Sequence, residues 1–495
     1  MVTIAKMPVR LWRWCRQRPV FVVAGLIALM LVLRLWWGWW VGRQVEGKLA
    51  ELRRQGHPVT LAEVPNAPVP DEENAWAWQV RAAKGANDDG IDSPRTSTME
   101  YPGYPPYSAQ WVKLAEASEK AHQENFRLAR RARDFSKVQT RKRLEAWGVI
   151  EFSHVNDVKW LTNLLADGAE YMQAQGNTEE ALYRLLDVLH VARSMRRDPF
   201  VIPQLVAIGI DVVACNAAQI IGPGLTRENL GKDAPARKAA VELINVLLDE
   251  DDRTARAGLA MDTERMFWVH TCKLIAEDTW VIRPLAQRDL IRALPNFDIL
   301  YNAAVLPSWP QARVVLQGSH WEEVEGKVDD QFTVMLRNMF GGKSAPPPRI
   351  VPRYSRWFYV GKDDVKGFIE RDFRCVAERR VTALALACQL YRVDHGKWPE
   401  RLDELPPAYL DAIPLDPFRA DEARIGYVLL HQAGGAQRPM LYYDAGADAP
   451  PPKEPTYGWY SGRQNGLTTD YDVRQYRDLS LFVPPSAKTV NYKPN

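Results

Sequence analysis

The side chains best placed to do chemistry are histidines and carboxylates spaced one helical turn apart. Glu323 follows His320 by three positions, and His190 follows Asp187 by three positions. A pair at this spacing can share one helix face, where it could bind a metal or transfer a proton. No third ligand is identifiable for His320 and Glu323, so we interpret them as a surface pair. For Asp187 and His190 we expect a local hydrogen bond.

Two further clusters suggest metal binding and receive the same interpretation. Asp262, Glu264 and His270 lie close together in sequence but lack a recognised ligand spacing. The run 249–252 is entirely acidic and is followed by two arginines. Opposite charges four positions apart stabilise an exposed helix, so this run predicts a solvated helix face. A metal site at the run is the alternative.

The sequence lacks the short motifs of common enzymes. It has no HExxH or CxxC zinc motif, no phosphate-binding Walker loop, no GxGxxG and no GxSxG. We therefore predict no catalytic residue, no resident cofactor and no identifiable small-molecule substrate. An enzyme whose site is assembled from dispersed residues remains an alternative.

The cysteines predict buried thiols rather than disulfides. Five cysteines in 495 residues are too few for a disulfide scaffold. Two of them, Cys375 and Cys388, share a predicted helix and would lie roughly 20 Å apart by the helical rise, too far to bond. We expect Cys215, Cys272, Cys375 and Cys388 to be buried and free.

The composition is that of a globular protein. Hydrophobic residues make up 46% and charged residues 25% of the chain, which excludes a disordered or collagen-like protein. Lysine and arginine number 64 against 61 aspartate and glutamate, a net charge of +3. This near balance gives no reason to expect nucleic-acid binding.

The strongest signal is an apolar segment near the N-terminus, Val20–Val41. Its 22 residues are enough to cross a hydrocarbon core about 30 Å thick. Four tryptophans near its end suit the membrane–water interface, and a nearby arginine can extend its charge to the headgroups. The predicted interface residues are Arg34, Trp36, Trp37, Trp39 and Trp40.

Flanking charge predicts the orientation of this span. Five basic residues precede it and four follow it. The excess of basic residues marks the cytoplasmic side. We therefore expect a single-pass protein of a bacterial inner membrane, with the N-terminus cytoplasmic and the bulk of the chain periplasmic. A cleaved signal peptide is the alternative, although no small-residue cleavage pattern follows the tryptophans.

A second apolar segment, Pro199–Ile221, contains polar residues that include Asp211 at its centre. An aspartate at the middle of a membrane helix costs about 2.5–3.5 kcal/mol. We predict a buried helix of a folded domain, with a second span as the alternative.

The remaining chain divides by composition. The predicted segments are a basic cytoplasmic N-terminus at 1–19, the transmembrane helix at 20–41, a juxtamembrane helix with a Pro-rich connector at 42–107, a helical domain at 108–344, a Pro-rich linker at 345–353, a long helix with a small α+β domain at 354–455, and an aromatic, polar tail at 456–495. The fold class is mainly α, with an irregular helical bundle or short solenoid and a short antiparallel sheet near the C-terminus.

Apolar stripes at helical spacing are clearest over Leu161–Arg193. Small residues at Gly168 and Ala181 and the turn Gly176-Asn177 give this stretch a resemblance to one tetratricopeptide-type hairpin. Such a hairpin cannot bury both stripes alone, so it must stack on neighbouring helices.

The C-terminal region carries a more extended pattern. A long predicted helix ends in Tyr391-Arg-Val-Asp-His-Gly-Lys-Trp-Pro399, followed by Ile413-Pro-Leu-Asp-Pro-Phe418 and two short strands. Over 382–455 the chain resembles the globular domain of type II secretion major pseudopilins. It also resembles large uncharacterised bacterial membrane proteins that carry this ending. The resemblance implies a small antiparallel sheet and a loop that can bind calcium, here at Asp444 and Asp448. A capped turn without metal is the alternative.

Three functional hypotheses follow. The first is a membrane-anchored, extracytoplasmic interaction or scaffold protein whose partners are the lipid bilayer and other proteins. The second is an accessory component of a secretion or pilus-like assembly. The third is an enzyme with an unrecognised site.

Overall fold

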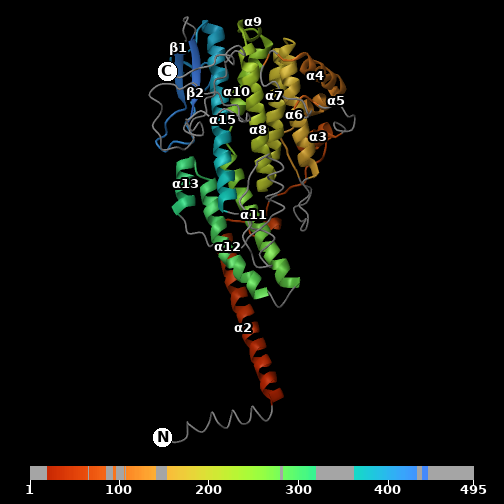
Figure 1. Cartoon of the computed structure of the whole chain (residues 1–495), viewed down its shortest axis with the longest axis vertical. Helices are drawn as coiled ribbons and strands as arrows, with labels where there is room; N and C mark the ends of the chain where they lie inside the picture. The colour runs from red at the N-terminus through yellow and green to blue at the C-terminus, as the bar shows by residue number, and fades with distance from the viewer. Residues whose placement is uncertain are drawn as a thin grey trace. The chain divides into compact units, whose positions relative to one another are not determined.

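The computed structural model describes residues 19–64, 66–84, 93–95, 105, 107–140, 153–278, 283–318, 362–431 and 437–443. The predicted features at His320 and Glu323, in the linker 345–353, at Asp444 and Asp448 and in the tail 456–495 lie outside these residues. Within them the chain is mainly helical, with one two-stranded antiparallel sheet (Figure 1). These elements confirm the predicted class at that level.

The chain forms two compact units. Of the described residues, the first unit contains 19–64, 264–278 and 283–298, and the second contains the rest. The elements that contribute to the first unit are α2 (Pro19–Arg54), η1 (Leu61–Glu63), the end of α11 (Arg253–Asp278) and the start of α12 (Arg283–Ala304).

The second unit contains the start of α11, the end of α12 and the remaining elements. They are α3 (Ala75–Ala83), α4 (Ala109–Ala121), α5 (Gln123–Ala132), α6 (Ser153–Ala174), α7 (Thr178–Met195), α8 (Val201–Ile221), η2 (Gly222–Gly224), α9 (Arg227–Leu230), α10 (Pro235–Leu248), α13 (Trp309–Gly318), α15 (Lys362–His395), η3 (Leu402–Glu404), β1 (Gly426–His431) and β2 (Gln437–Tyr442).

Helix α2 is continuous for 36 residues, which corrects the prediction of a separate juxtamembrane helix after the apolar segment. Nothing interrupts it because no proline lies within its interior and its glycines are isolated. The helix ends at Arg54, and Gly56 then adopts a φ of 88°, a left-handed value that favours glycine.

The core of the first unit is built on the C-terminal half of α2. Val45, Leu49 and Leu52 recur at helical spacing and are buried. They pack in one apolar cluster with Val59 and with residues of α11 and α12, namely Val269, Cys272, Leu290 and Leu294. One helix therefore carries an exposed apolar half and a buried half.

In the second unit, α6, α7 and α8 pack on one another, and α15 packs on α8 and α10 (Figure 1). The stripes predicted from sequence face this core. Val158, Leu161 and Leu165 of α6 and Leu185 and Val188 of α7 are completely buried. Helices α3, α4 and α5 contact α6 or α7 from another side.

Asparagine side chains cap two helices of the second unit. Asn74 caps α3 by accepting a 3.1 Å hydrogen bond from the Trp76 amide. Asn177 caps α7 by accepting a 3.2 Å hydrogen bond from the Glu180 amide. Asparagine is a strong N-cap, and in both cases its side chain reaches an amide of the first turn.

The apolar segment Pro199–Ile221 is a buried helix of the second unit, α8. By length and composition both α2 and α8 could cross a membrane, but 72% of the apolar window of α8 is buried inside the protein, against 0% for α2. Asp211 is 2% exposed and accepts a 2.6 Å hydrogen bond from Arg196. The central aspartate is therefore satisfied inside a folded unit.

The C-terminal elements match the predicted order. Helix α15 ends at His395, and Gly396 has a φ of 72°. Trp398 packs back on this helix, with the Arg392 guanidinium carbon 4.5 Å from its ring centroid. Strands β1 and β2 pair antiparallel, with Gly426 opposite Tyr442.

Candidate functional site

The predicted thiols are buried and free. Cys215, Cys272, Cys375 and Cys388 form no disulfide. Burial raises the pKa of Cys375 well above its ordinary value, so the thiol is not activated as a nucleophile. Over the part of the chain that the structure describes, no group of three His, Cys, Asp or Glu side chains could hold a metal ion.

The acidic run 249–252 does not form a helix face. It occupies the turn between α10 and α11, and its carboxylates pair with arginines from several segments. One predicted local pair is present, since Arg256 lies 3.3 Å from Asp252 at i,i+4 spacing. The run thus fastens neighbouring helices to one another.

A buried ionic cluster lies between the end of α7 and α8, α11 and α15. Arg196 pairs with Asp211, and Arg253 lies 2.6 Å from Asp372. Cys375 contacts Asp211 at 3.5 Å. Buried charges are stable only when paired in this way, so we interpret the cluster as structural.

The prediction of a local hydrogen bond between Asp187 and His190 is wrong. Asp187 instead accepts a 2.8 Å hydrogen bond from Nε of Arg130, and His190 bonds the Ala132 carbonyl oxygen through Nε2 over 3.1 Å. Both partners come from α5 and its C-terminal end. The two side chains of α7 are therefore used to attach α5.

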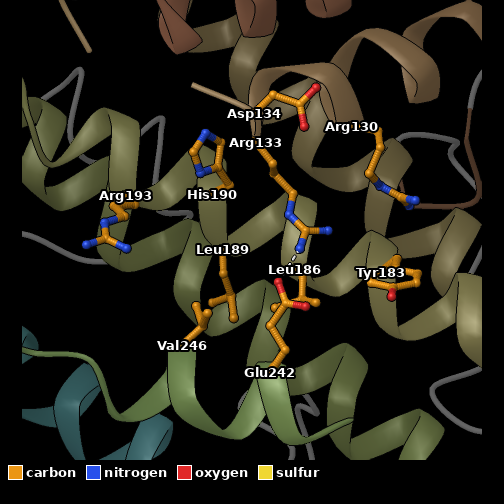
Figure 2. A pocket seen from close by; sticks show the side chains of 10 residues that line it. All are labelled: Arg130, Arg133, Asp134, Tyr183, Leu186, Leu189, His190, Arg193, Glu242 and Val246. Carbon is orange, nitrogen blue, oxygen red and sulfur yellow. Dashed lines mark hydrogen bonds and ion pairs between the residues drawn. The ribbon is translucent and has the colours of Figure 1, made fainter. Parts of the chain in front are cut away.

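Beside this contact lies a pocket of about 470 Å³, which we call the α5–α7–α10 pocket. Its lining residues are Arg130, Arg133, Asp134, Tyr183, Leu186, Leu189, His190, Arg193, Glu242 and Val246. Figure 2 shows His190 beside Arg193, with Arg130 and Tyr183 across the pocket and Glu242 joined to Arg133. Leu186, Leu189 and Val246 give it an apolar floor.

Asp187 pairs with two of the arginines that line the pocket. Arg130 lies 2.8 Å from the carboxylate and Arg133 lies 3.4 Å from it. Both guanidinium carbons also approach the Tyr183 ring, at 5.1 and 5.6 Å from its centroid. Burial raises the pKa of Asp187 to about 6, so the carboxylate remains ionised at neutral pH.

Burial and the neighbouring arginines determine the protonation state of His190. Burial and, next, repulsion from Arg133 and Arg193 lower its pKa to about 4. The imidazole is therefore neutral at pH 7. Because a carbonyl oxygen can only accept, Nε2 carries the proton and Nδ1 presents a lone pair. Among the residues that the structure describes, Arg193 has one carboxylate partner, Asp249, at 3.1 Å.

Sequence reasoning missed this pocket because its walls come from three distant segments. A local signal was present in the stretch 127–133, which holds four arginines in seven residues. The carboxylates that position Arg130 and Arg133, Asp187 and Glu242, lie more than fifty residues further along the chain.

The predicted membrane-interface residues lie on α2. The side chains of Trp36, Trp39 and Trp40 are 60%, 57% and 46% exposed, and Trp37 is half-buried. Arg34 bends toward the C-terminal end of the helix, since a Cβ added at Gly38 would lie 3.1 Å from its Nη1 atom. This direction is the one expected for an arginine that extends its charge past the tryptophans.

Comparison of the chain with protein-family models, with curated proteins and with solved structures found no match.

Proposed function

We propose that the protein is a single-pass membrane protein whose folded units act outside the cytoplasm as an interaction or scaffold module. In this proposal α2 crosses a bacterial inner membrane, its N-terminus lies in the cytoplasm, and residues that follow the span lie in the periplasm. The bilayer and one or more proteins are the partners.

One observation carries this proposal. Among the described residues, 16 large hydrophobic side chains are exposed, and 13 of them lie between Phe21 and Trp40. Exposed apolar area of this extent is unfavourable in water and favourable in lipid. The absence of charge other than Arg34 along this half of α2 supports the same environment.

The continuity of α2 favours an anchor over a cleaved signal peptide. Val41, Val45, Leu49 and Leu52 are buried on the same helix that exposes Trp36 and Trp40. A protease needs an extended substrate, and a regular helix through this boundary offers none. Signal peptides also end in an A-x-A type of cleavage pattern, and no such pattern follows these tryptophans.

Membrane extraction tests the anchor. The full chain should remain in the membrane pellet after an alkaline carbonate wash. Replacing Ile27 and Met30 with aspartate should reduce the membrane-inserted fraction, because each charge costs about 2.5–3.5 kcal/mol in the bilayer centre. Val314→Asp is the matched control, since Val314 is 70% exposed but belongs to another helix. Complete release of the wild-type chain by carbonate would contradict the proposal.

The interaction role needs a separate test. The chain, solubilised from crosslinked membranes, should retain specific proteins that an unrelated single-span protein does not. Recovery of the same proteins by both baits would contradict a dedicated interaction module.

The second candidate, an accessory component of a secretion assembly, has one supporting observation. Helix α15 is followed by a turn at Gly396 and then by the β1–β2 hairpin, the order expected from the pseudopilin resemblance. A deletion strain with unchanged secretion would remove this candidate.

A further inference from the structure

We propose that the α5–α7–α10 pocket binds a small carboxylic acid that carries a hydroxyl group beside its carboxylate and an apolar group beyond it. Nδ1 of His190 accepts a hydrogen bond from the hydroxyl group, Arg193 pairs with the carboxylate, and Leu186, Leu189 and Val246 contact the apolar group. This site is independent of the proposed membrane anchor.

The preference for a hydroxyl donor comes from His190. Its Nε2–H is already used by the Ala132 carbonyl oxygen, 3.1 Å away. Over the described residues, no other hydrogen bond engages the ring, so Nδ1 is left as an acceptor on the pocket lining. A ligand that places a bare anionic oxygen there would meet a lone pair, whereas a hydroxyl would donate to it.

The preference for a carboxylate comes from Arg193. The other two arginines of the lining are already paired with carboxylates, since Arg130 and Arg133 share Asp187 and Arg133 also pairs with Glu242. Over the described residues, Arg193 has one carboxylate partner for five N–H groups, and its side chain is 53% exposed. It is therefore the guanidinium with most capacity to bind a further carboxylate.

The relative positions of these groups require the hydroxyl and carboxylate to be close together. His190 and Arg193 lie three residues apart on α7 and therefore on one helix face. They lie side by side in Figure 2. A pocket of about 470 Å³ exceeds the volume of these two groups, and Leu186, Leu189 and Val246 can contact an apolar substituent.

Mandelate and phenylacetate form a matched probe pair, since they differ only by the hydroxyl group. We expect the full chain in nonionic detergent to bind mandelate saturably in calorimetry. Phenylacetate should bind about 10- to 100-fold more weakly, because a site built around a hydroxyl rejects an analogue that lacks it. Equal affinity for the two acids would overturn the proposal.

Three variants locate the site. Arg193→Gln should weaken mandelate binding about tenfold or more, while Arg127→Gln on exposed α5 surface should leave it unchanged. His190→Phe should remove the preference for mandelate over phenylacetate rather than all binding. Mandelate affinity that is unaffected by Arg193→Gln, or a hydroxyl preference that survives in His190→Phe, would place the acid elsewhere. Far-ultraviolet circular dichroism confirms that each variant is folded.

Discussion

Arg184 on α7 donates a 2.7 Å hydrogen bond from Nη2 to Oε1 of Glu119 on α4, and the two side chains are only 5% and 10% exposed. The guanidinium carbon also lies 3.9 Å from the ring centroid of Phe126 on α5. A single buried arginine thus connects three helices of the second unit.

Breaking this pair should destabilise the second unit strongly. Arg184→Met leaves the Glu119 carboxylate buried without its partner, which costs about 3–5 kcal/mol. Arg127→Met is the control, because Arg127 and Glu124 form an exposed pair, 63% accessible on each side, and solvent screening makes the loss of such a pair nearly neutral. Urea unfolding followed by tryptophan fluorescence compares the two. Equal unfolding midpoints would show that the buried pair contributes no more than the exposed one.

Gly168 gives a second test of the same junction. A Cβ at this position would overlap Nη1 of Arg184 and lie 3.1 Å from the Phe126 ring. Because Arg184 is held by Glu119, Gly168→Ala should cost about 1–3 kcal/mol. Gly209→Ala on α8 should instead stabilise the second unit. A Cβ there meets nothing within 4 Å, and alanine is favoured over glycine in a helix by about 0.5–1 kcal/mol. Unfolding free energies that change in the same direction for both variants would contradict this account of Gly168.

The two halves of α2 should respond differently to the same substitution. Leu49 is 1% exposed in the core of the first unit, and Leu35 is 66% exposed. Leu49→Ala should destabilise the first unit by about 2–5 kcal/mol, as expected for a buried leucine. Leu35→Ala should leave its stability unchanged. Thermal unfolding in detergent micelles separates these results, and equal losses would refute a division of α2 into lipid-facing and core halves.

His190 should make the stability of the second unit depend on pH. Its pKa is lowered to about 4 in the folded chain, against about 6.5 when unfolded. The stabilisation from the neutral ring is therefore present above pH 6.5 and is lost as the pH falls toward 4, by up to about 3 kcal/mol. Asp187 has the opposite effect on stability. Because its pKa is raised to about 6 in the folded chain, its contribution lowers the free energy of unfolding as the pH rises from 4 to 6.

NMR titration of the His190 ring measures its contribution separately from that of Asp187. Proton NMR of His190 should report a pKa near 4. Arg193→Gln should raise it, because one of the two repelling guanidinium groups is removed. A wild-type ring that titrates near 6.5 would contradict a buried, neutral imidazole.

Local patterns in the sequence predicted the elements whose partners are near in sequence. The long helix α15, its end beside Gly396 and the β1–β2 hairpin each depend on spacing within a short segment. The burial of α8 was also predictable, because Asp211 cannot be satisfied in lipid but is satisfied by Arg196.

Features that depend on distant partners could not be predicted in this way. The expected bond between Asp187 and His190 fails because α5 supplies better partners for both, a guanidinium and a carbonyl oxygen. The change along α2 from exposed to buried residues depends on α11 and α12, more than two hundred residues away. The charged residues that follow Val41 mark the end of the apolar segment, but the sequence does not identify the helices that bury Leu49 and Leu52.

The central claim is that α2 is the sole membrane crossing and that the folded units lie outside the cytoplasm. Two topology reporters test it most directly, one fused after Asn495 and one inserted between Ala345 and Pro352. Both should give a periplasmic signal in the intact chain. Opposite signals would contradict a single crossing, and two cytoplasmic signals would contradict the orientation.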